Sequence, residues 1–255
     1  MQCSELAARL DAELDTAAYA DVDASANGLQ VGPANVTVEH VAFAVDAAQQ
    51  TIDAAAEAGA NLLVTHHGLS WGGIERITGT TYQRVAPLVD DELALYVSHL
   101  PLDGHGEYGN AAGLADLLDL GNRAPFGTMG GEHIGQQGHL PSPTGVADLQ
   151  ATLETELDTG GQPVRALAFG PGRVQQVAIV TGSGADWLDE AVEAGADAFV
   201  TGEGKQAIYH EAREAGIDVL LAGHYATETF GVRALQSLVE EWGIETTFID
   251  CPTGL

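Results

Sequence analysis

Two adjacent histidines follow an apolar segment of this chain and are the first candidates for chemistry. His66 and His67 come directly after the run NLLVT and precede Gly68. Adjacent side chains inside a strand point to opposite faces, but at the carboxyl end of a strand, where the chain turns, both can reach one pocket. Open α/β sheets bind their ligands at that edge. A single histidine there is usually a hydrogen-bonded structural residue, whereas an adjacent pair favours metal binding or catalysis.

Two histidine–carboxylate pairs share a second spacing. His224 and Glu228 are four residues apart after the apolar run DVLLAG, and His99 and Asp103 are four residues apart after ALYVS. Residues at this spacing share one face of a helix, and imidazole with carboxylate is a frequent ligand combination for first-row metals. Pro101 makes the earlier helix start less regular. The alternative for each pair is an exposed helix pair in a chain rich in acidic residues.

Together these positions predict a metal site with nitrogen and oxygen ligands. Five ligands exceed the four of a tetrahedral site and suit two ions that share a carboxylate. Two ions ~3.5–4 Å apart can clamp a phosphoryl or carbonyl oxygen and activate water near neutral pH. Donors without sulfur fit zinc, iron, manganese or nickel and do not distinguish among these metals. The predicted ligands are His66, His67, Asp103, His224 and Glu228.

An internal repeat indicates the elements that position these residues. EAGANLLVTHHG at 57–68 aligns with EAGADAFVTGEG at 193–204, and VAFAVD at 41–46 aligns with VAIVTG at 177–182, both 136 residues apart. Each copy is an apolar run, a helical stretch that ends in EAGA, and a second apolar run, which is typical of a βαβ unit. The segment 92–103 also resembles 216–228, and this alignment makes His99 and His224 equivalent.

The repeat predicts an α/β fold of two similar halves related by duplication. We expect the first half at 1–125, and the second half, with the segment that joins it, at 126–255. The joint, about 121–174, is rich in glycine and proline and should contain one amphipathic helix near 145–157. Helices are expected at 109–120 and 227–242, and a short strand near 250.

Composition narrows the functional classes. The chain has 37 acidic and 9 basic residues and a formal net charge of −28, so neither nucleic acids nor anionic membrane surfaces are expected partners. The acids are spread along the sequence, which favours a protein of a high-salt cell, where a Debye length of ~3 Å screens self-repulsion. The alternative is an acidic surface for a partner. Without a recognisable signal peptide, membrane span or CxxC motif, we expect a cytoplasmic protein.

Five segments resemble a known family over nearly the whole chain. They are NGLQVG (27–32), VTHHG (64–68), SHLPLDGHGEYGNAAGLADLL (98–118), VTGEGK (200–205) and AGHYATETFGVRAL (222–235). In this order they resemble the short form of the Nif-three-like dinuclear metal-centre proteins, known in bacteria as GTP cyclohydrolase I type 2 homologues. Together with the excess of acidic residues, this resemblance leads us to expect a halophilic archaeon as the source. The resemblance implies two divalent metal ions on the same five residues, two intertwined three-layer α/β/α halves, and a ring-shaped homohexamer with the metals facing its cavity.

Other residues in these motifs are candidates for supporting roles. The resemblance does not make His99 a direct ligand, and we interpret it as a residue that orients a ligand or carries a proton; a purely structural role is the alternative. Lys205 is the single lysine and a candidate phosphate contact on the substrate side, although its position can also be chance. His105, Glu107 and Asn110 are further candidates for the substrate side.

The resulting hypothesis is a metal-dependent hydrolase of a nucleotide or another small phosphorylated substrate. Glu228 and His99 would be its catalytic residues, the first as a bridging carboxylate and the second as acid or base. The GTP cyclohydrolase activity that the resemblance implies would open a purine ring. The alternative is a non-enzymatic protein that handles metals or regulates a partner. An open metal position and a cationic pocket would favour the enzyme.

Overall fold

The computed structural model describes residues 1–255, which form two compact units. Unit 1 consists of Met1–Leu102 and Gly231–Cys251, and unit 2 consists of Asp103–Phe230 and Pro252–Leu255. Each unit contains one β-sheet with helices, so the chain has a duplicated α/β fold. Because residues 231–251 return to unit 1, the units do not follow a single boundary at 125, and Asp103 belongs with the second sheet.

The sheet of unit 1 has the strand order β1-β4-β3-β2-β11. Its strands are β1 (Gly28–Val31), β2 (His40–Asp46), β3 (Leu62–His67), β4 (Ala94–Val97) and β11 (Glu245–Phe248). β4, β3, β2 and β11 are parallel, and β1 joins the edge antiparallel to β4. The three central strands are apolar and buried along almost their whole length, as expected where helices cover both faces of a parallel sheet.

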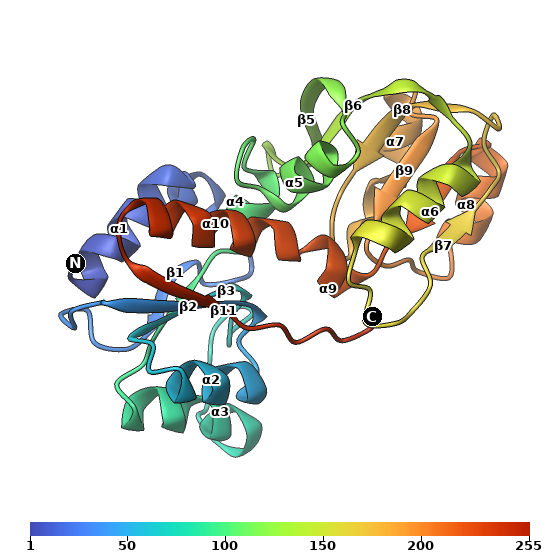
Figure 1. Ribbon diagram of the computed structural model, residues 1–255. Coiled ribbons are helices and arrows are strands. Elements are labelled where there is room, and N and C mark those ends of the chain that lie inside the picture. Colours follow the sequence, from blue (N-terminus) through green and yellow to red (C-terminus); the bar gives the residue numbers. More distant parts are fainter. The chain divides into compact units, whose positions relative to one another are not determined.

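Helices cover both faces of this sheet. They are α1 (Cys3–Glu13), α2 (Gln49–Glu57), α3 (Gly79–Asp90) and α10 (Thr229–Glu241), and the short helix η1 (Thr16–Tyr19) follows α1. Figure 1 shows α2 and α3 on one face of the sheet and α1 and α10 on the other. On the first face, Ile52 of α2 and Leu88 of α3 share an apolar cluster with Ala42 of β2. On the second face, the hydroxyl of Tyr96 donates to Asp11 of α1 at 2.9 Å.

The sheet of unit 2 has the strand order β5-β6-β8-β9-β10-β7. Its strands are β5 (Gly121–Met129), β6 (Glu132–Thr144), β7 (Arg165–Leu167), β8 (Val174–Ile179), β9 (Ala198–Thr201) and β10 (Asp218–Leu221). β8, β9 and β10 are parallel, whereas β5, β6 and β7 run antiparallel to their neighbours.

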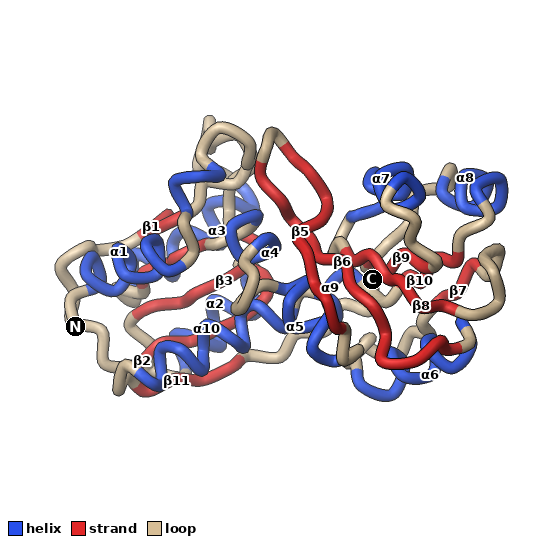
Figure 2. Tube along the Cα trace, turned by 90° about the horizontal axis from the view of Figure 1, so that it is seen from above, coloured by secondary structure: helices blue, strands red, loops and turns tan.

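The helices of unit 2 also lie on two faces. An apolar cluster joins the central strands to α5 (Asn110–Leu117), α6 (Val146–Glu156) and α9 (His224–Thr227). The opposite face carries η2 (Gly184–Trp187), α7 (Leu188–Glu193) and α8 (Ile208–Ala215); Figure 2 shows α7 and α8 across the sheet from α6. The boundary between unit 1 and unit 2 falls within the short helix α4 (Leu100–Gly104), after Leu102.

The register of the parallel strands confirms the duplication. Val41 pairs with Leu62 between β2 and β3, and Val177 pairs with Ala198 between β8 and β9. These two pairs are related by the 136-residue offset of the sequence repeat. The crossover helices α2 and α7 both end at the glutamate of EAGA.

The third parallel strands follow the expected alignment of 92–103 with 216–228. Ala94 of β4 and Asp218 of β10 occupy corresponding places beside β3 and β9, and they are 124 residues apart. Counted from these positions, His99 corresponds to Gly223 and not to His224. His99 and His224 therefore align only with one additional residue after β10, as expected from the lengths of the two segments, because 216–228 is one residue longer than 92–103.

The joint contains more structure than its composition indicated. α6 lies at the expected position, but β5 and β6 form a long antiparallel hairpin where a loop was expected. Gly131 in the hairpin turn has φ +101°, and Gly135 approaches Ile179 so closely that a Cβ would overlap its carbonyl oxygen. These glycines permit a turn and a close backbone approach within a sheet.

The remaining expected elements are confirmed. The helices predicted at 109–120 and 227–242 are α5 and α10, and the strand predicted near 250 is β11. No helix of the chain combines the length and the apolar character that crossing a membrane requires.

Candidate metal centre

Three histidines of unit 1 come together at the carboxyl ends of β3 and β4. His66 and His67 are the last two residues of β3, and His99 follows β4. The ring centroid of His66 lies 4.6 Å from that of His67 and 5.1 Å from that of His99, and one nitrogen of each ring lies within 4.8 Å of the others. Three imidazoles at this distance could hold a metal ion.

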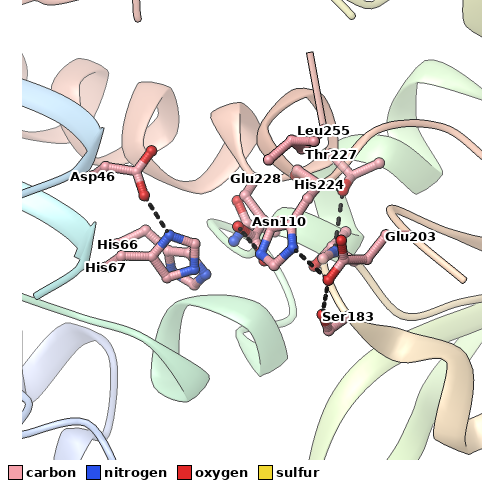
Figure 3. Close-up of polar contacts among 12 residues, drawn as sticks. Asp46, His66, His67, Asn110, Ser183, Glu203, His224, Thr227, Glu228 and Leu255 are labelled. Carbon is pink, nitrogen blue, oxygen red and sulfur yellow. Dashed lines mark hydrogen bonds and ion pairs between the residues drawn. The ribbon is translucent and has the colours of Figure 1, made fainter. Parts of the chain in front are cut away.

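The orientations of His66 and His67 are set through their Nδ1 atoms. Nδ1 of His66 lies 3.0 Å from the main-chain oxygen of Ser98. Nδ1 of His67 lies 2.8 Å from Oδ1 of Asp46, a contact drawn in Figure 3. A carbonyl oxygen only accepts, so Nδ1 of His66 carries the hydrogen and the neutral ring presents the lone pair of Nε2. Oxygen partners of this kind fix the tautomer of metal-binding histidines.

His99 is held by a buried carboxylate that the sequence did not single out. The side chain of Asp23 accepts hydrogen bonds from His99 Nδ1 at 2.9 Å, Ser25 N at 2.8 Å, Asn27 Nδ2 at 2.8 Å and Leu100 N at 3.0 Å. Burial raises the pKa of Asp23, but the hydrogen bond and charge of His99, with the donors from Asn27 and Ser25, outweigh it and lower the pKa overall. Asn27, from the NGLQVG motif, also accepts from the main-chain nitrogen of His99 at 2.8 Å.

An exposed tryptophan adjoins the histidine cluster of unit 1. The ring of Trp71 is 4.8 Å from that of His99, edge to face, and 6.0 Å from that of His67. Trp71 is 52% exposed and is anchored by a β-bridge to Ser25. No spacing in the sequence distinguishes this tryptophan, because it lies in the loop after the motif VTHHG.

His224 and Glu228 are in direct contact in unit 2. Nε2 of His224 lies 3.1 Å from Oε2 of Glu228, and its Nδ1 lies 3.3 Å from Oε1 of Glu203 (Figure 3). Burial lowers the pKa of His224, but hydrogen bonds and charge from Glu228 and Glu203 overcome this and raise the pKa to about 9. A hydrogen bond from Ser183 is the main cause that lowers the pKa of Glu203, although burial opposes it, and His224 adds to the lowering.

A glycine makes room for this pair. Gly182 follows β8 with φ +57°, and a Cβ there would collide with Oε1 of Glu228 and lie 3.0 Å from Nε2 of His224. Its main-chain nitrogen donates to Oγ1 of Thr227 at 3.1 Å. The glycine that ends the repeated segment VAIVTG thus has a steric role at the carboxyl edge of the sheet.

Asp103 is the third candidate ligand of unit 2. It is buried and accepts hydrogen bonds from Asn110 Nδ2 at 2.9 Å and Thr181 Oγ1 at 3.1 Å. Its carboxylate lies within 4.8 Å of that of Glu228. Glu228 therefore adjoins both Asp103 and His224, which is the position of a carboxylate that could be shared by two ions.

The expected substrate-side residues have different surroundings. Asn110 is buried against Asp103. Nδ1 of His105 accepts from the main-chain nitrogens of Glu107 and Tyr108, and its ring stacks on Tyr108 with centroids 5.0 Å apart. The Glu107 side chain is exposed.

The donor set is that of a first-row divalent metal. Unit 1 offers imidazole nitrogens and unit 2 offers the imidazole of His224 with the carboxylates of Asp103 and Glu228, and neither cysteine is among these residues. Such sets bind zinc, iron, manganese or nickel. The residues therefore fit the expected kind of ion.

Comparisons with known proteins cover nearly the whole chain. A sequence model of the family Duf34/NIF3 (NGG1p interacting factor 3) matches residues 1–253. A protein of Halobacterium salinarum named GTP cyclohydrolase 1 type 2 homolog is 58% identical over 255 residues, which is 100% of both chains, and one of the same name from Archaeoglobus fulgidus is 41% identical over 256 residues, again 100% of both.

Two solved structures share the fold over 100% of both chains. TTHA1606 from Thermus thermophilus is 37% identical with a TM-score of 0.90, and a protein named ybgI, of unknown function, is 36% identical with a TM-score of 0.91. Identity at this level over the full length goes beyond a shared architecture. The chain therefore belongs to the Duf34/NIF3 family.

Proposed function

We propose that His66, His67, Asp103, His224 and Glu228 hold two divalent metal ions. The observation that carries the proposal is the gathering of ligand atoms: in unit 1, a ring nitrogen of His66 lies within 4.8 Å of one of His67. In unit 2, Glu228 adjoins both Asp103 and His224. Oxygen partners on the Nδ1 atoms of His66 and His67 orient both rings, as is usual for metal ligands.

We further propose that the protein is a metal-dependent hydrolase of a nucleotide or a small phosphorylated substrate. Bound metal ions of this kind polarise a carbonyl or phosphoryl oxygen and activate water. The relatives named GTP cyclohydrolase 1 type 2 homolog support a nucleotide as the substrate class.

His99 has the surroundings of a proton carrier. Asp23 holds its Nδ1, and a buried carboxylate in this position fixes the orientation and the tautomer of an imidazole. The Nε2 atom of the same ring can then accept or deliver a proton. Trp71 lies edge to face against the same ring.

Turnover of a substrate panel tests the hydrolase. Nucleotides and phosphoesters are incubated in molar KCl with metal-loaded wild-type protein, with Glu228→Ala and with Glu211→Ala, an exposed glutamate of α8 in the same unit. We expect turnover by the wild type, a loss of about 100-fold or more in Glu228→Ala, and no loss in Glu211→Ala. Equal activity of wild type and Glu228→Ala would contradict the assigned site.

Absence of turnover by fully loaded protein would contradict the hydrolase. The name of the family, NGG1p interacting factor 3, would then support the second candidate, a non-enzymatic protein that handles metals or regulates a partner.

A further inference from the structure

Two of the nine basic residues line one cavity of unit 2. Arg165 and Lys205 border a space of about 220 Å³, together with Gln206, Tyr209 and the apolar Leu221. No aspartate or glutamate is among the residues that line it, although the chain has 37 of them. In a protein of net charge −28, this wall is locally cationic, which suits an anionic ligand.

The sheet brings Arg165 to the same edge as the candidate metal ligands of unit 2. β7 runs antiparallel to β10, so its first residue, Arg165, lies opposite Leu221, the last residue of β10. Lys205 follows the neighbouring strand β9. Gly204 lies beside Leu221, where a Cβ would be only 3.0 Å from the leucine side chain, so glycine keeps the wall of the cavity compact.

A second cavity extends from this one toward His224. It measures about 340 Å³, shares Arg165, Gly204 and Leu221 with the first, and is lined further by Glu203 and Gly223. Glu203 contacts Nδ1 of His224 at 3.3 Å, and Gly223 precedes that histidine. A ligand that extends through both cavities would thus have an anionic end at Arg165 and its other end beside a candidate metal ligand.

Lys205 is available for a ligand although it has a partner. Its Nζ lies 2.5 Å from Oδ2 of Asp186, and the two side chains are 61% and 64% exposed. Exposed ion pairs contribute little to stability, so exchange of Asp186 for a more strongly charged anion costs little. Arg165 forms no ion pair in the structure, and a guanidinium can bind two phosphate oxygens at once.

We propose that the cavity of Arg165 and Lys205 binds the phosphate group of a small phosphorylated substrate. The inference rests on the proposed function and gives its substrate an anchor: the phosphate is bound between the two cations, and the reacting part lies toward His224. The phosphate that is held there is not the group that reacts.

Binding of inorganic phosphate to metal-free protein tests the anchor independently of turnover. Phosphorus NMR line widths are followed during titration of wild type, Arg165→Gln, Lys205→Gln and, as the matched control, Arg213→Gln, an exposed arginine of α8 outside the cavity. We expect saturable broadening, a weakening of at least about tenfold in each cavity variant, and no change in Arg213→Gln. Tighter binding is expected in Asp186→Asn, because Lys205 is then released.

Several results would overturn the anchor. One is the absence of saturable broadening in the wild type. Another is a loss of phosphate affinity in Arg213→Gln as large as that in Arg165→Gln, because it would show that binding depends on the overall charge and not on the cavity. In metal-loaded protein, Arg165→Gln should raise KM for a phosphorylated substrate at least about tenfold with kcat changed less than about twofold. An unchanged KM would contradict a role of the cavity in substrate binding. Phosphate binding without any turnover would contradict the proposed hydrolase, whereas the cavity would still be an anion-binding site.

Discussion

At the residue scale, Asp23 organises the histidine cluster of unit 1. Its side chain is 1% exposed and accepts donors from its own loop and from the segment after β4, including Nδ1 of His99. A carboxylate surrounded by four donors is fully satisfied in spite of its burial. The position of His99 therefore depends on a residue outside every motif of the sequence.

Asp23→Asn should destabilise the protein. An asparagine offers a single acceptor oxygen, and in either orientation its NH₂ group would face at least one main-chain N–H, of Ser25 or of Leu100, which can only donate. We expect the free energy of unfolding to fall by about 2–4 kcal/mol, measured by urea unfolding in molar KCl. The exposed neighbour Asp21 provides the control, and Asp21→Asn should change stability by less than about 0.5 kcal/mol. Equal losses in the two variants would contradict this role.

The lowered pKa of Asp23 also predicts acid sensitivity. A carboxylate whose pKa is lower in the folded than in the unfolded state stabilises the fold above its ordinary pKa, and this contribution is lost as the pH falls through the lowered value. The urea midpoint of the wild type should therefore decrease on acidification more steeply than that of Asp23→Asn. If the urea midpoints of the two proteins fell equally with pH, the lowered pKa of Asp23 would not contribute to stability.

At the element scale, the end of β8 leaves space for the Glu228 carboxylate. Gly182 and Gly195 both have positive φ, +57° and +76°, but a Cβ at Gly182 meets Glu228 whereas a Cβ at Gly195 meets no atom within 4 Å. Alanine would therefore strain the backbone at both positions, but only at Gly182 would its methyl group also collide with another side chain.

Gly182→Ala should weaken metal binding, whereas Gly195→Ala should not. Displacement of the Glu228 carboxylate by the new methyl group is expected to lower metal affinity at least about tenfold, measured by competition with a chromophoric chelator. Stability should also fall by about 1–3 kcal/mol more in Gly182→Ala than in Gly195→Ala. Equal affinities in the two variants would show that Glu228 adapts without cost to binding.

The elements that the sequence predicted well are those with an unambiguous pattern. β2, α2 and β3 could be predicted because buried parallel strands are continuous apolar runs and because the second copy repeats them in register. β5 and β6 could not, since their glycines and prolines are those of loops as well as of a tightly packed hairpin. Asp23 could not be distinguished among 37 acidic residues, because its contact with the site is made with His99, 76 residues further along the chain.

At the scale of the whole molecule, the excess of acidic residues is the dominant property. With a formal net charge of −28 over 255 residues, self-repulsion opposes compaction at low ionic strength, and salt screens it. A relative from Halobacterium salinarum shares 58% of the residues. We propose that the protein folds in molar salt.

Removal of salt should unfold the protein reversibly. Far-ultraviolet circular dichroism should show loss of helix on dialysis from molar to millimolar KCl and recovery when KCl is restored. Sucrose at equal osmolality should not replace KCl, because it does not screen charge. A spectrum that is unchanged in millimolar KCl would contradict this prediction.

The metal content of the purified chain tests the central claim most directly. Protein stripped with a chelator and reloaded in molar KCl is analysed by mass spectrometry of the elements, with single alanine variants of His66, His67, Asp103, His224 and Glu228 and with His210→Ala, an exposed histidine, as control. We predict two divalent ions per chain in the wild type and in His210→Ala, and fewer in each of the five variants. A wild type that retains no divalent ion, or variants that retain both, would contradict the account.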